Sequence, residues 1–128
     1  MALASTHRDL EVFRISFDTA MELFRLSKNF PREELYSLTD QIRRSSRSVS
    51  ANIAESFRKR RYKKMFISKL TDCESEAAET QVWIDFAMEC GYIEKETHTC
   101  LYEKYDRIIG KIVNMINSAE SWSKQYIG

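Results

Sequence analysis

Residues 41–61 read QIRRSSRSVSANIAESFRKRR. Apolar side chains recur through this region at the three- and four-residue spacing of one helix face, although the stretch is basic and rich in Ser and Ala. The pattern predicts an amphipathic helix whose apolar stripe packs in a core. Its basic face then either packs against neighbouring helices or binds a polyanion. The stripe contains Leu35, Leu38, Ile42, Ser45, Val49, Ile53 and Phe57.

The composition favours a helical, globular protein. A chain of 128 residues suits one domain with its own core, and 43% apolar with 30% charged residues is typical of ordered proteins. Three Gly and one Pro are too few for the turns of most sheet folds. No apolar run approaches a membrane span or a signal peptide, and the three cysteines fit free thiols. We therefore expect a cytoplasmic protein without membrane association.

Four helical patterns follow one another along the chain. Asn29-Phe30-Pro31 ends the first, the basic run after Phe57 interrupts the second, and Gly91 stops the third, with Tyr92 and Ile93 as its hydrophobic cap contact. Four amphipathic helices with short connections predict an all-α, antiparallel up-down four-helix bundle that occupies residues 1–128 as one domain. The expected helices span about residues 8–28, 33–58, 62–90 and 95–123.

Each helix has a predicted core face. On the fourth helix the apolar residues from Leu101 to Trp122 alternate in steps of four and three, like a heptad seam. Cys73 and Cys90 are expected in or near the core of the third helix. The predicted core stripe of the first helix consists of Leu10, Phe13, Phe17, Ala20 and Phe24, with Val12, Leu23 and Leu26 off the stripe.

Some large apolar residues are left over. Val82, Trp83 and Phe86 point away from the core stripe of the third helix when residues are placed 100° apart. Large exposed aromatic side chains usually mark a contact surface, which favours an oligomer. A broad core within a monomer is the alternative.

Charge is strongly divided along the chain. Residues 41–64 hold nine Lys and Arg against one acid, a net charge of +8, whereas residues 72–106 hold ten acids against two Lys, a net charge of −8. Such a chain either attracts a polyanion at one end or pairs with copies of itself.

Two long segments resemble a known family. They are FPREELYSLTDQIRRSSRSVSANIAE, residues 30–55, and FISKLTDCESEAAETQVWIDFAMECGYI, residues 66–93. Together they resemble the bacterial four-helix-bundle proteins called 23S ribosomal RNA intervening-sequence proteins, and the likeness extends from about Leu10 to Met115. One departure is Ser56, where the family usually has the Gly that closes its second helix. We therefore expect this helix to continue to about Arg58.

The resemblance implies an all-α bundle that assembles as a ring-shaped homopentamer. Relatives include the accessory protein of diversity-generating retroelements, a basic pentamer that works with a reverse transcriptase and nucleic acid. The resemblance implies no established activity.

The outer face of the second helix gives one set of candidate residues. Its arginines can contact phosphates through their planar donor forks, or can pair with the acidic third or fourth helix of the same or a neighbouring subunit. The small Ala51 and Ala54 favour close packing of another helix. Arg43 lies on the flank of this face. The predicted oligomer interface contains Arg44, Arg47, Ala51, Ala54, Glu55, Val82, Trp83 and Phe86.

The run that follows is the preferred nucleic-acid candidate. Its later residues open the third helix, where positive charge opposes the helix dipole, so the cluster favours a functional role over a solvated loop. Tyr62 is the one aromatic residue in the run, so we expect no base-specific recognition. The predicted phosphate contacts are Arg58, Lys59, Arg60, Arg61, Lys63 and Lys64, with Arg43, Arg44 and Arg47 as secondary candidates.

No arrangement typical of an enzyme is found. Cys90, His98 and Cys100 lack zinc-site spacing and a fourth ligand, and neither a phosphate loop nor a nucleophile elbow occurs. Ser45 and Ser46 should face the core instead of serving a kinase. We expect no cofactor, no metal and no catalysis.

These observations predict a self-assembling scaffold with nucleic acid, RNA or DNA, as its leading partner. The alternative is a protein-interaction scaffold whose basic residues are consumed by intersubunit salt bridges. A third interpretation is an adaptor for an enzyme that acts on nucleic acid.

Overall fold

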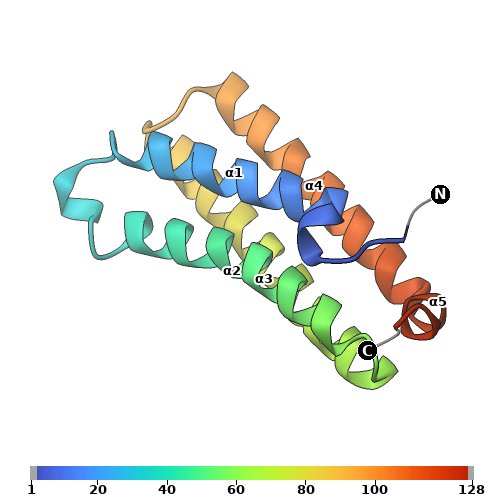
Figure 1. Cartoon of the computed structure of the whole chain (residues 1–128). Helices are drawn as coiled ribbons and strands as arrows, with labels where there is room; N and C mark the ends of the chain where they lie inside the picture. Colours follow the sequence, from blue (N-terminus) through green and yellow to red (C-terminus); the bar gives the residue numbers. More distant parts are fainter. Residues whose placement is uncertain (1–2, 127–128) are drawn as a thin grey trace.

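The computed structural model describes residues 3–126, which form an all-helical bundle. Consecutive long helices run in opposite directions (Figure 1), each packs against the next, and α1 packs against α4 to close the bundle. Consequently α1 and α3 lie diagonally opposite each other, as do α2 and α4. The predicted four-helix bundle is confirmed. Its long helices are α1 (Glu11–Ser27), α2 (Leu38–Lys59), α3 (Lys63–Glu89) and α4 (Lys95–Asn117).

Three short helices complete the chain: η1 (His7–Asp9), η2 (Arg32–Glu34) and α5 (Ala119–Lys124). The fourth helix was predicted to run unbroken to residue 123, but the chain leaves α-helical geometry at Ser118, with φ −106° and ψ 19°. The turn at Ser118 directs α5 onto α3, where the Trp122 ring lies 6.2 Å from the Phe66 ring. The predicted heptad seam ran on through Trp122 because α4 and α5 pack on the same core, so the apolar spacing did not reveal the break between them.

The start of α2 also differs from the prediction. The chain after Pro31 forms the separate 3-10 turn η2, so α2 begins at Leu38 instead of near residue 33. Leu35 therefore lies outside the regular helix and is 43% exposed, which removes it from the predicted core stripe. The other stripe residues of α2 are buried as predicted.

Gly91 ends the described α3 helix as predicted. Its φ of +79° is left-handed, a conformation that glycine adopts without strain. The N–H of Gly91 donates to the carbonyl of Met88 at 2.9 Å, and that of Tyr92 donates to the carbonyl of Ala87 at 2.8 Å. These two bonds form a Schellman cap, which satisfies carbonyl groups at the helix end.

Small polar side chains bring α2 close to its neighbours. The Thr80 hydroxyl on α3 donates to Ser45 Oγ at 2.8 Å, and the hydroxyls of Ser16 and Ser50 join α1 to α2 at 2.9 Å. Ser45 and Ser46 are buried, as predicted. Cys73 is also buried, but Cys90 is exposed, so the prediction for Cys90 was wrong because the chain turns away from the core beside Gly91.

The core face of α1 was predicted only in part. Leu10 and Ala20 are buried as predicted, but Val12 and Leu23, placed off the stripe, are 4% and 2% exposed, whereas Phe17 is 51% exposed. Placed 100° apart, the apolar residues of this helix spread over about two thirds of its circumference, so periodicity alone could not identify the buried side. The position of Ser16 identifies the buried side, because its hydroxyl has a buried hydrogen-bond partner, Ser50, on α2.

Among residues 3–126, no helix has both the length and the apolar character needed to cross a bilayer.

Candidate nucleic-acid interface

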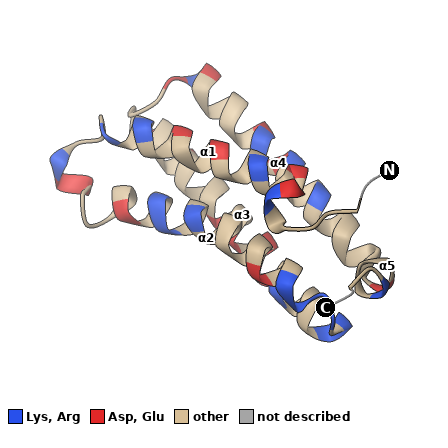
Figure 2. Cartoon of the chain, viewed as in Figure 1, with Lys and Arg blue, Asp and Glu red and all other residues tan. Residues whose placement is uncertain are grey.

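Lys and Arg gather where α2 passes into α3 (Figure 2), and we call residues 58–64 the basic turn. Lys59 ends α2, Lys63 begins α3, and three residues connect them. Neither helix end contributes a carboxylate here: the last turn of α2 is basic, and the first turn of α3 contains no acid.

Arg60 is the buried member of the basic turn. Its guanidinium carbon lies 3.7 Å from the centroid of the Phe57 ring, and its Nη1 donates to the Phe57 carbonyl at 2.6 Å. The residue is 7% exposed. Burial lowers the pKa of Arg60, and the charge of Arg58 lowers it further. Arg60 therefore packs against Phe57, and its charge is not exposed to a phosphate.

Arg61 is exposed but is held by the end of the chain. Its Nη2 donates to the hydroxyl of Tyr126, and its guanidinium carbon lies 4.5 Å from the centroid of the Tyr126 ring. The Ser123 hydroxyl donates to the Arg61 carbonyl at 3.2 Å. Hydrogen bonds to Tyr62 and Tyr126 raise the pKa of Arg61, so its charge is fixed.

The remaining basic side chains of the turn have no carboxylate partner. Arg58, Lys63 and Lys64 are exposed and Lys59 is half-buried. Within residues 3–126, none of the four forms an ion pair. Tyr62, in the same turn, is 55% exposed. The turn is thus a concentration of uncompensated positive charge at one end of the bundle.

The arginines in the middle of α2 have different surroundings. Arg44 forms ion pairs with Glu79 and, at 3.5 Å, with Glu76 of α3. Arg43 donates through Nε to Ser27 Oγ at 2.8 Å and lies 4.8 Å from the centroid of the Phe24 ring. Arg44 therefore pairs with the acidic third helix of the same chain, which is one of the two interpretations given for this face.

Arg47 and Glu55 complete this face. The guanidinium of Arg47 lies 5.6 Å from the centroid of the Phe24 ring, and Glu55 pairs with Lys69 at 2.7 Å. Ala51 is exposed and Ala54 is half-buried.

The predicted interface residues of α3 are largely uncovered. Val82 and Phe86 are 46% and 52% exposed. Trp83 is half-buried, donates through Nε1 to Glu79 at 3.2 Å, and lies 5.9 Å from Phe86 between ring centroids. A groove of about 250 Å³ separates Trp83 and Phe86 from the start of α2 at Leu38.

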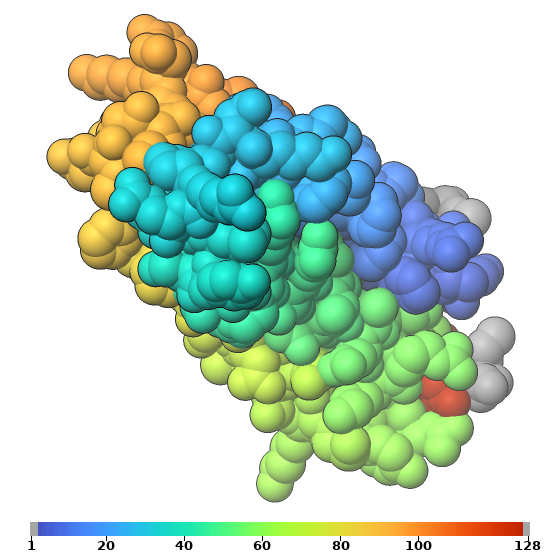
Figure 3. Space-filling model, turned by 90° about the vertical axis from the view of Figure 1, so that its left-hand side faces the viewer, coloured from blue at the N-terminus to red at the C-terminus, as the bar shows by residue number. Residues whose placement is uncertain are grey.

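Besides Phe17, sequence reasoning missed a second exposed aromatic residue. Tyr36 is 91% exposed in the connection between α1 and α2. Figure 3 shows this connection, in cyan, as a lobe on the surface beside α1 and α2. With Leu35 it borders a groove of about 570 Å³ that also reaches Arg43, Arg44 and Arg47. The prediction missed Tyr36 because it began the second helix near residue 33. The available signal for the irregular connection was the Phe30-Pro31 pair before it.

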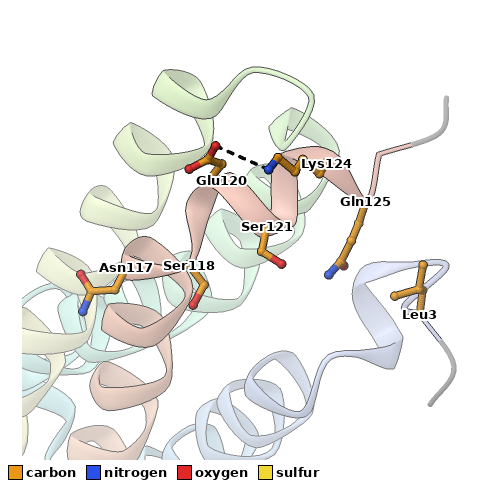
Figure 4. Close-up of a pocket in the computed structure, with 7 residues that line it drawn as sticks. All are labelled: Leu3, Asn117, Ser118, Glu120, Ser121, Lys124 and Gln125. Carbon is orange, nitrogen blue, oxygen red and sulfur yellow. Dashed lines mark ion pairs between the residues drawn. The ribbon is translucent and has the colours of Figure 1, made fainter.

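Another hollow lies between the N-terminal segment and α5 (Figure 4). It has a volume of about 670 Å³, and Leu3 stands on one side with Ser121 and Gln125 on the other. Its charged residues, Glu120 and Lys124, pair with each other at 3.6 Å. The hollow therefore offers neither a free charge nor an enclosed apolar surface.

Cys90, His98 and Cys100, whose spacing argued against a zinc site, have separate surroundings. Nε2 of His98 is hydrogen-bonded to Asp85 at 2.6 Å, and Cys90 and Cys100 are exposed free thiols. Within the described part of the chain, no three His, Cys, Asp or Glu side chains form a group that could hold a metal ion.

The sequence from residue 8 to residue 114 matches the family described as 23S rRNA-intervening sequence protein. The chain belongs to this family. The resemblance found in its two long segments is thereby confirmed.

A solved structure agrees with the family assignment. A protein with unknown function from the S23 ribosomal protein family of Bacteroides thetaiotaomicron is 26% identical to this chain, and the match covers 83% of this chain and 95% of the other, with a TM-score of 0.74. No curated protein matches the chain.

The part of the chain that matches the intervening-sequence family contains the whole basic turn and ends before α5. The contacts of Ser123 and Tyr126 with Arg61 thus lie outside the matched region, whereas the burial of Arg60 against Phe57 lies within it.

Proposed function

We propose that this intervening-sequence family protein is a non-catalytic, self-associating scaffold that binds nucleic acid through the phosphate backbone. The basic turn is the contact surface, and recognition is independent of base sequence. Arg61 and the exposed Lys63 and Lys64 provide its charges. The role belongs in the cytoplasm, where RNA and DNA are accessible and thiols remain reduced.

One observation carries this proposal. The six Lys and Arg of the basic turn lie within seven consecutive residues and have no carboxylate partner among residues 3–126, whereas Arg44, Lys69 and Lys104 are paired. Clustered positive charge without internal partners attracts a polyanion, because each phosphate contact releases counterions from the nucleic acid. A scaffold that repeats the turn in several copies would bind more tightly for the same reason.

Self-association has separate support. Phe17, Val82 and Phe86 are each about half exposed on the long helices, and large apolar side chains at a surface are typical of contact sites.

A salt series tests the nucleic-acid contact. Affinity for duplex RNA and duplex DNA is measured by fluorescence anisotropy from low to high salt, for the wild type and for Arg61→Gln/Lys63→Gln/Lys64→Gln. If three phosphate contacts are lost, the slope of log affinity against log salt should become shallower by about 2.7. The matched control is Arg25→Gln/Arg32→Gln/Lys95→Gln, which removes the same charge from exposed positions at the other end of the bundle and should keep the wild-type slope.

The same assay identifies the competing interpretation. Absence of binding at low salt, or equal slopes for the wild type and the turn variant, contradicts the proposal. A turn variant that instead changes the mass of the assembly, with no nucleic-acid binding by either protein, would indicate that these charges form intersubunit salt bridges.

A further inference from the structure

The C-terminal segment adds an aromatic ring to the basic turn. The guanidinium carbon of Arg60 lies 3.7 Å from the centroid of the Phe57 ring and 5.3 Å from that of the Tyr126 ring. The guanidinium carbon of Arg61 lies 4.5 Å from the Tyr126 centroid and 5.7 Å from the Tyr62 centroid. Aromatic rings and guanidinium groups therefore alternate from Phe57 to Tyr62, and we call this arrangement the aromatic stack.

The aromatic stack runs from the core to the surface. Phe57 is 1% exposed, whereas Tyr62 is 55% exposed although Arg61 lies over its ring. The backbone of Tyr62 is fixed on both sides. Its N–H donates to the Lys59 carbonyl at 2.9 Å, and its carbonyl accepts from the N–H of Phe66 at 2.9 Å. The stack therefore ends in an exposed aromatic ring on an anchored backbone.

Arg61 is oriented beside that exposed ring. Its Nη2 donates to the Tyr126 hydroxyl, and the Ser123 hydroxyl donates to the Arg61 carbonyl at 3.2 Å. Neither partner is a carboxylate, so these contacts position the charge of Arg61 without neutralising it. An arginine that is held in this way loses less conformational entropy when it binds an anion.

An exposed ring beside an oriented guanidinium fits an unpaired nucleotide. Such a nucleotide presents a planar base close to a phosphate, and every base has a face that can stack on an aromatic side chain. In a duplex the bases are already stacked on one another, so Tyr62 has no free base to contact. The charges of the turn suit both forms of nucleic acid, but its aromatic ring suits only the unpaired form.

We propose that the basic turn binds an unpaired nucleotide, whose base stacks on Tyr62 and whose phosphate contacts Arg61. Tyr126 is a positioning residue that acts through Arg61. The inference rests on the proposed function, because it names the form of nucleic acid that the basic turn prefers. Tyr126 lies beyond residues 8–114, which match the intervening-sequence family, so membership of the family does not imply the aromatic stack.

Two oligomers of equal charge separate stacking from phosphate contact. One is a fluorescein-labelled oligothymidylate, and the other has the same phosphates but an abasic unit in place of every nucleoside. Fluorescence anisotropy at low salt measures the affinity of the protein for each oligomer and for duplex DNA. The wild type should bind the oligothymidylate about fivefold to a hundredfold more tightly than the abasic oligomer, the range expected for one stacked base.

Substitutions at Tyr62 test the stacked base. Tyr62→Leu should lower the affinity for the oligothymidylate to that for the abasic oligomer and leave the affinity for duplex DNA unchanged. Tyr62→Phe retains an aromatic ring and should retain the wild-type preference. Tyr36→Leu is the matched control, because Tyr36 is 91% exposed at the other end of the bundle, and it should also retain that preference.

A double-mutant comparison tests the positioning role of Tyr126. Tyr126→Leu should weaken the binding of both oligomers by the same factor, about twofold to tenfold, because it frees the side chain of Arg61. In an Arg61→Gln background the same substitution should have no further effect. An additional loss in that background would show that Tyr126 does not act through Arg61, which overturns its assignment as a positioning residue.

The remaining outcomes distinguish this inference from the proposed function. Equal wild-type affinities for the two oligomers, with a salt slope that becomes shallower in the turn variant, would overturn stacking and leave the phosphate contact in place. A preference for oligothymidylate that persists in Tyr62→Leu would place the stacked base elsewhere and overturn the assignment. If no oligomer or duplex binds at low salt, the inference and the proposed nucleic-acid contact both fail.

Discussion

The middle of α2 and its C-terminal end are both rich in arginine, yet the fold treats them differently. Arg44 in the middle pairs with two glutamates of α3, and Arg43 bonds to Ser27 and stacks on Phe24. At the end, Arg58 and the lysines that open α3 have no carboxylate partner among the described residues. The two regions therefore share a basic composition but differ in how many of their charges have carboxylate partners within the described chain.

The two regions also differ in packing. The middle of α2 is held by buried contacts to α3, such as Thr80 with Ser45 and the Cys73 thiol, which donates to the Val49 carbonyl at 3.2 Å. The end is held by Arg60 over Phe57 and by the C-terminal segment on Arg61.

The largest expected difference concerns thiol reactivity. Burial, assisted by the negative charges of Glu76 and Asp72, raises the pKa of Cys73 to about 12, whereas Cys90 and Cys100 are exposed. At pH 8 the thiolate fraction of Cys73 should be about a thousandfold below that of an ordinary thiol, so alkylation should be slower by at least that factor. Mass spectrometry of timed iodoacetamide reactions measures the three rates.

The same group gives a pH dependence with a defined sign. Because the folded-state pKa of Cys73 is raised above the unfolded value of about 8.5, its contribution to stability is complete below that pH and declines as pH rises toward 12. Urea midpoints should fall between pH 8 and pH 10 by more in the wild type than in Cys73→Ala. Equal reaction rates for all three thiols would show that the contact between Cys73 and α2 is not closed to solvent.

Next in size is the contrast between two adjacent arginines of the basic turn. Arg60→Ala removes a buried cation–π contact and a charged hydrogen bond, so the free energy of unfolding should fall by about 2 kcal/mol. Arg61→Ala, at an exposed position, should change it by no more than about 0.5 kcal/mol. Urea denaturation with matched m values measures both, and similar losses would contradict the division of the turn into a packing and a binding arginine.

Thr80→Val tests the polar contact in the middle of α2. It removes the donor to Ser45 and leaves a buried hydroxyl with one partner fewer, at a cost of about 1–2 kcal/mol. Thr71→Val is the matched control, because the hydroxyls of Thr80 and Thr71 both lie 2.8 Å from the carbonyl oxygen four residues earlier, but Thr71 is exposed and has no partner on α2. Its unfolding free energy should stay near that of the wild type. If the two variants are equally stable, the hydrogen bond between Thr80 and Ser45 makes no measurable contribution to the contact between α2 and α3.

The smallest effect is expected for Arg44→Gln. Its ion pairs are partly exposed, so the loss of unfolding free energy should be at most about 1 kcal/mol and should vanish in high salt. Nucleic-acid affinity should remain that of the wild type. If affinity instead falls as far as in the basic-turn variant, the distinction between the two regions of α2 fails.

Several features of the fold follow from local rules. The helical class, the stripe from Leu38 to Phe57 and the cap at Gly91 could be predicted because each depends on residues within one or two turns of helix. The buried face of α1 could not be predicted, since Val12 and Phe17 lie on competing apolar stripes of the same helix. A helical period gives the direction of each stripe but not the position of the neighbouring helix.

The candidate site, likewise, could be predicted only in part. Its charges were evident from the run between Arg58 and Lys64, but the burial of Arg60 depends on where Phe57 points, and the support of Arg61 comes from Tyr126, 65 residues away. The break at Ser118 was hidden because residues on both sides of it pack on one core.

By itself, the sequence determined a helical bundle, its approximate helices and the separation of positive from negative charge, because composition and short-range spacing set these properties. Only the tertiary structure decided which arginines have partners, which side of α1 is buried, and that Arg60 packs against Phe57. Those properties depend on which side chains and helices lie against one another, and that is decided only when the helices pack.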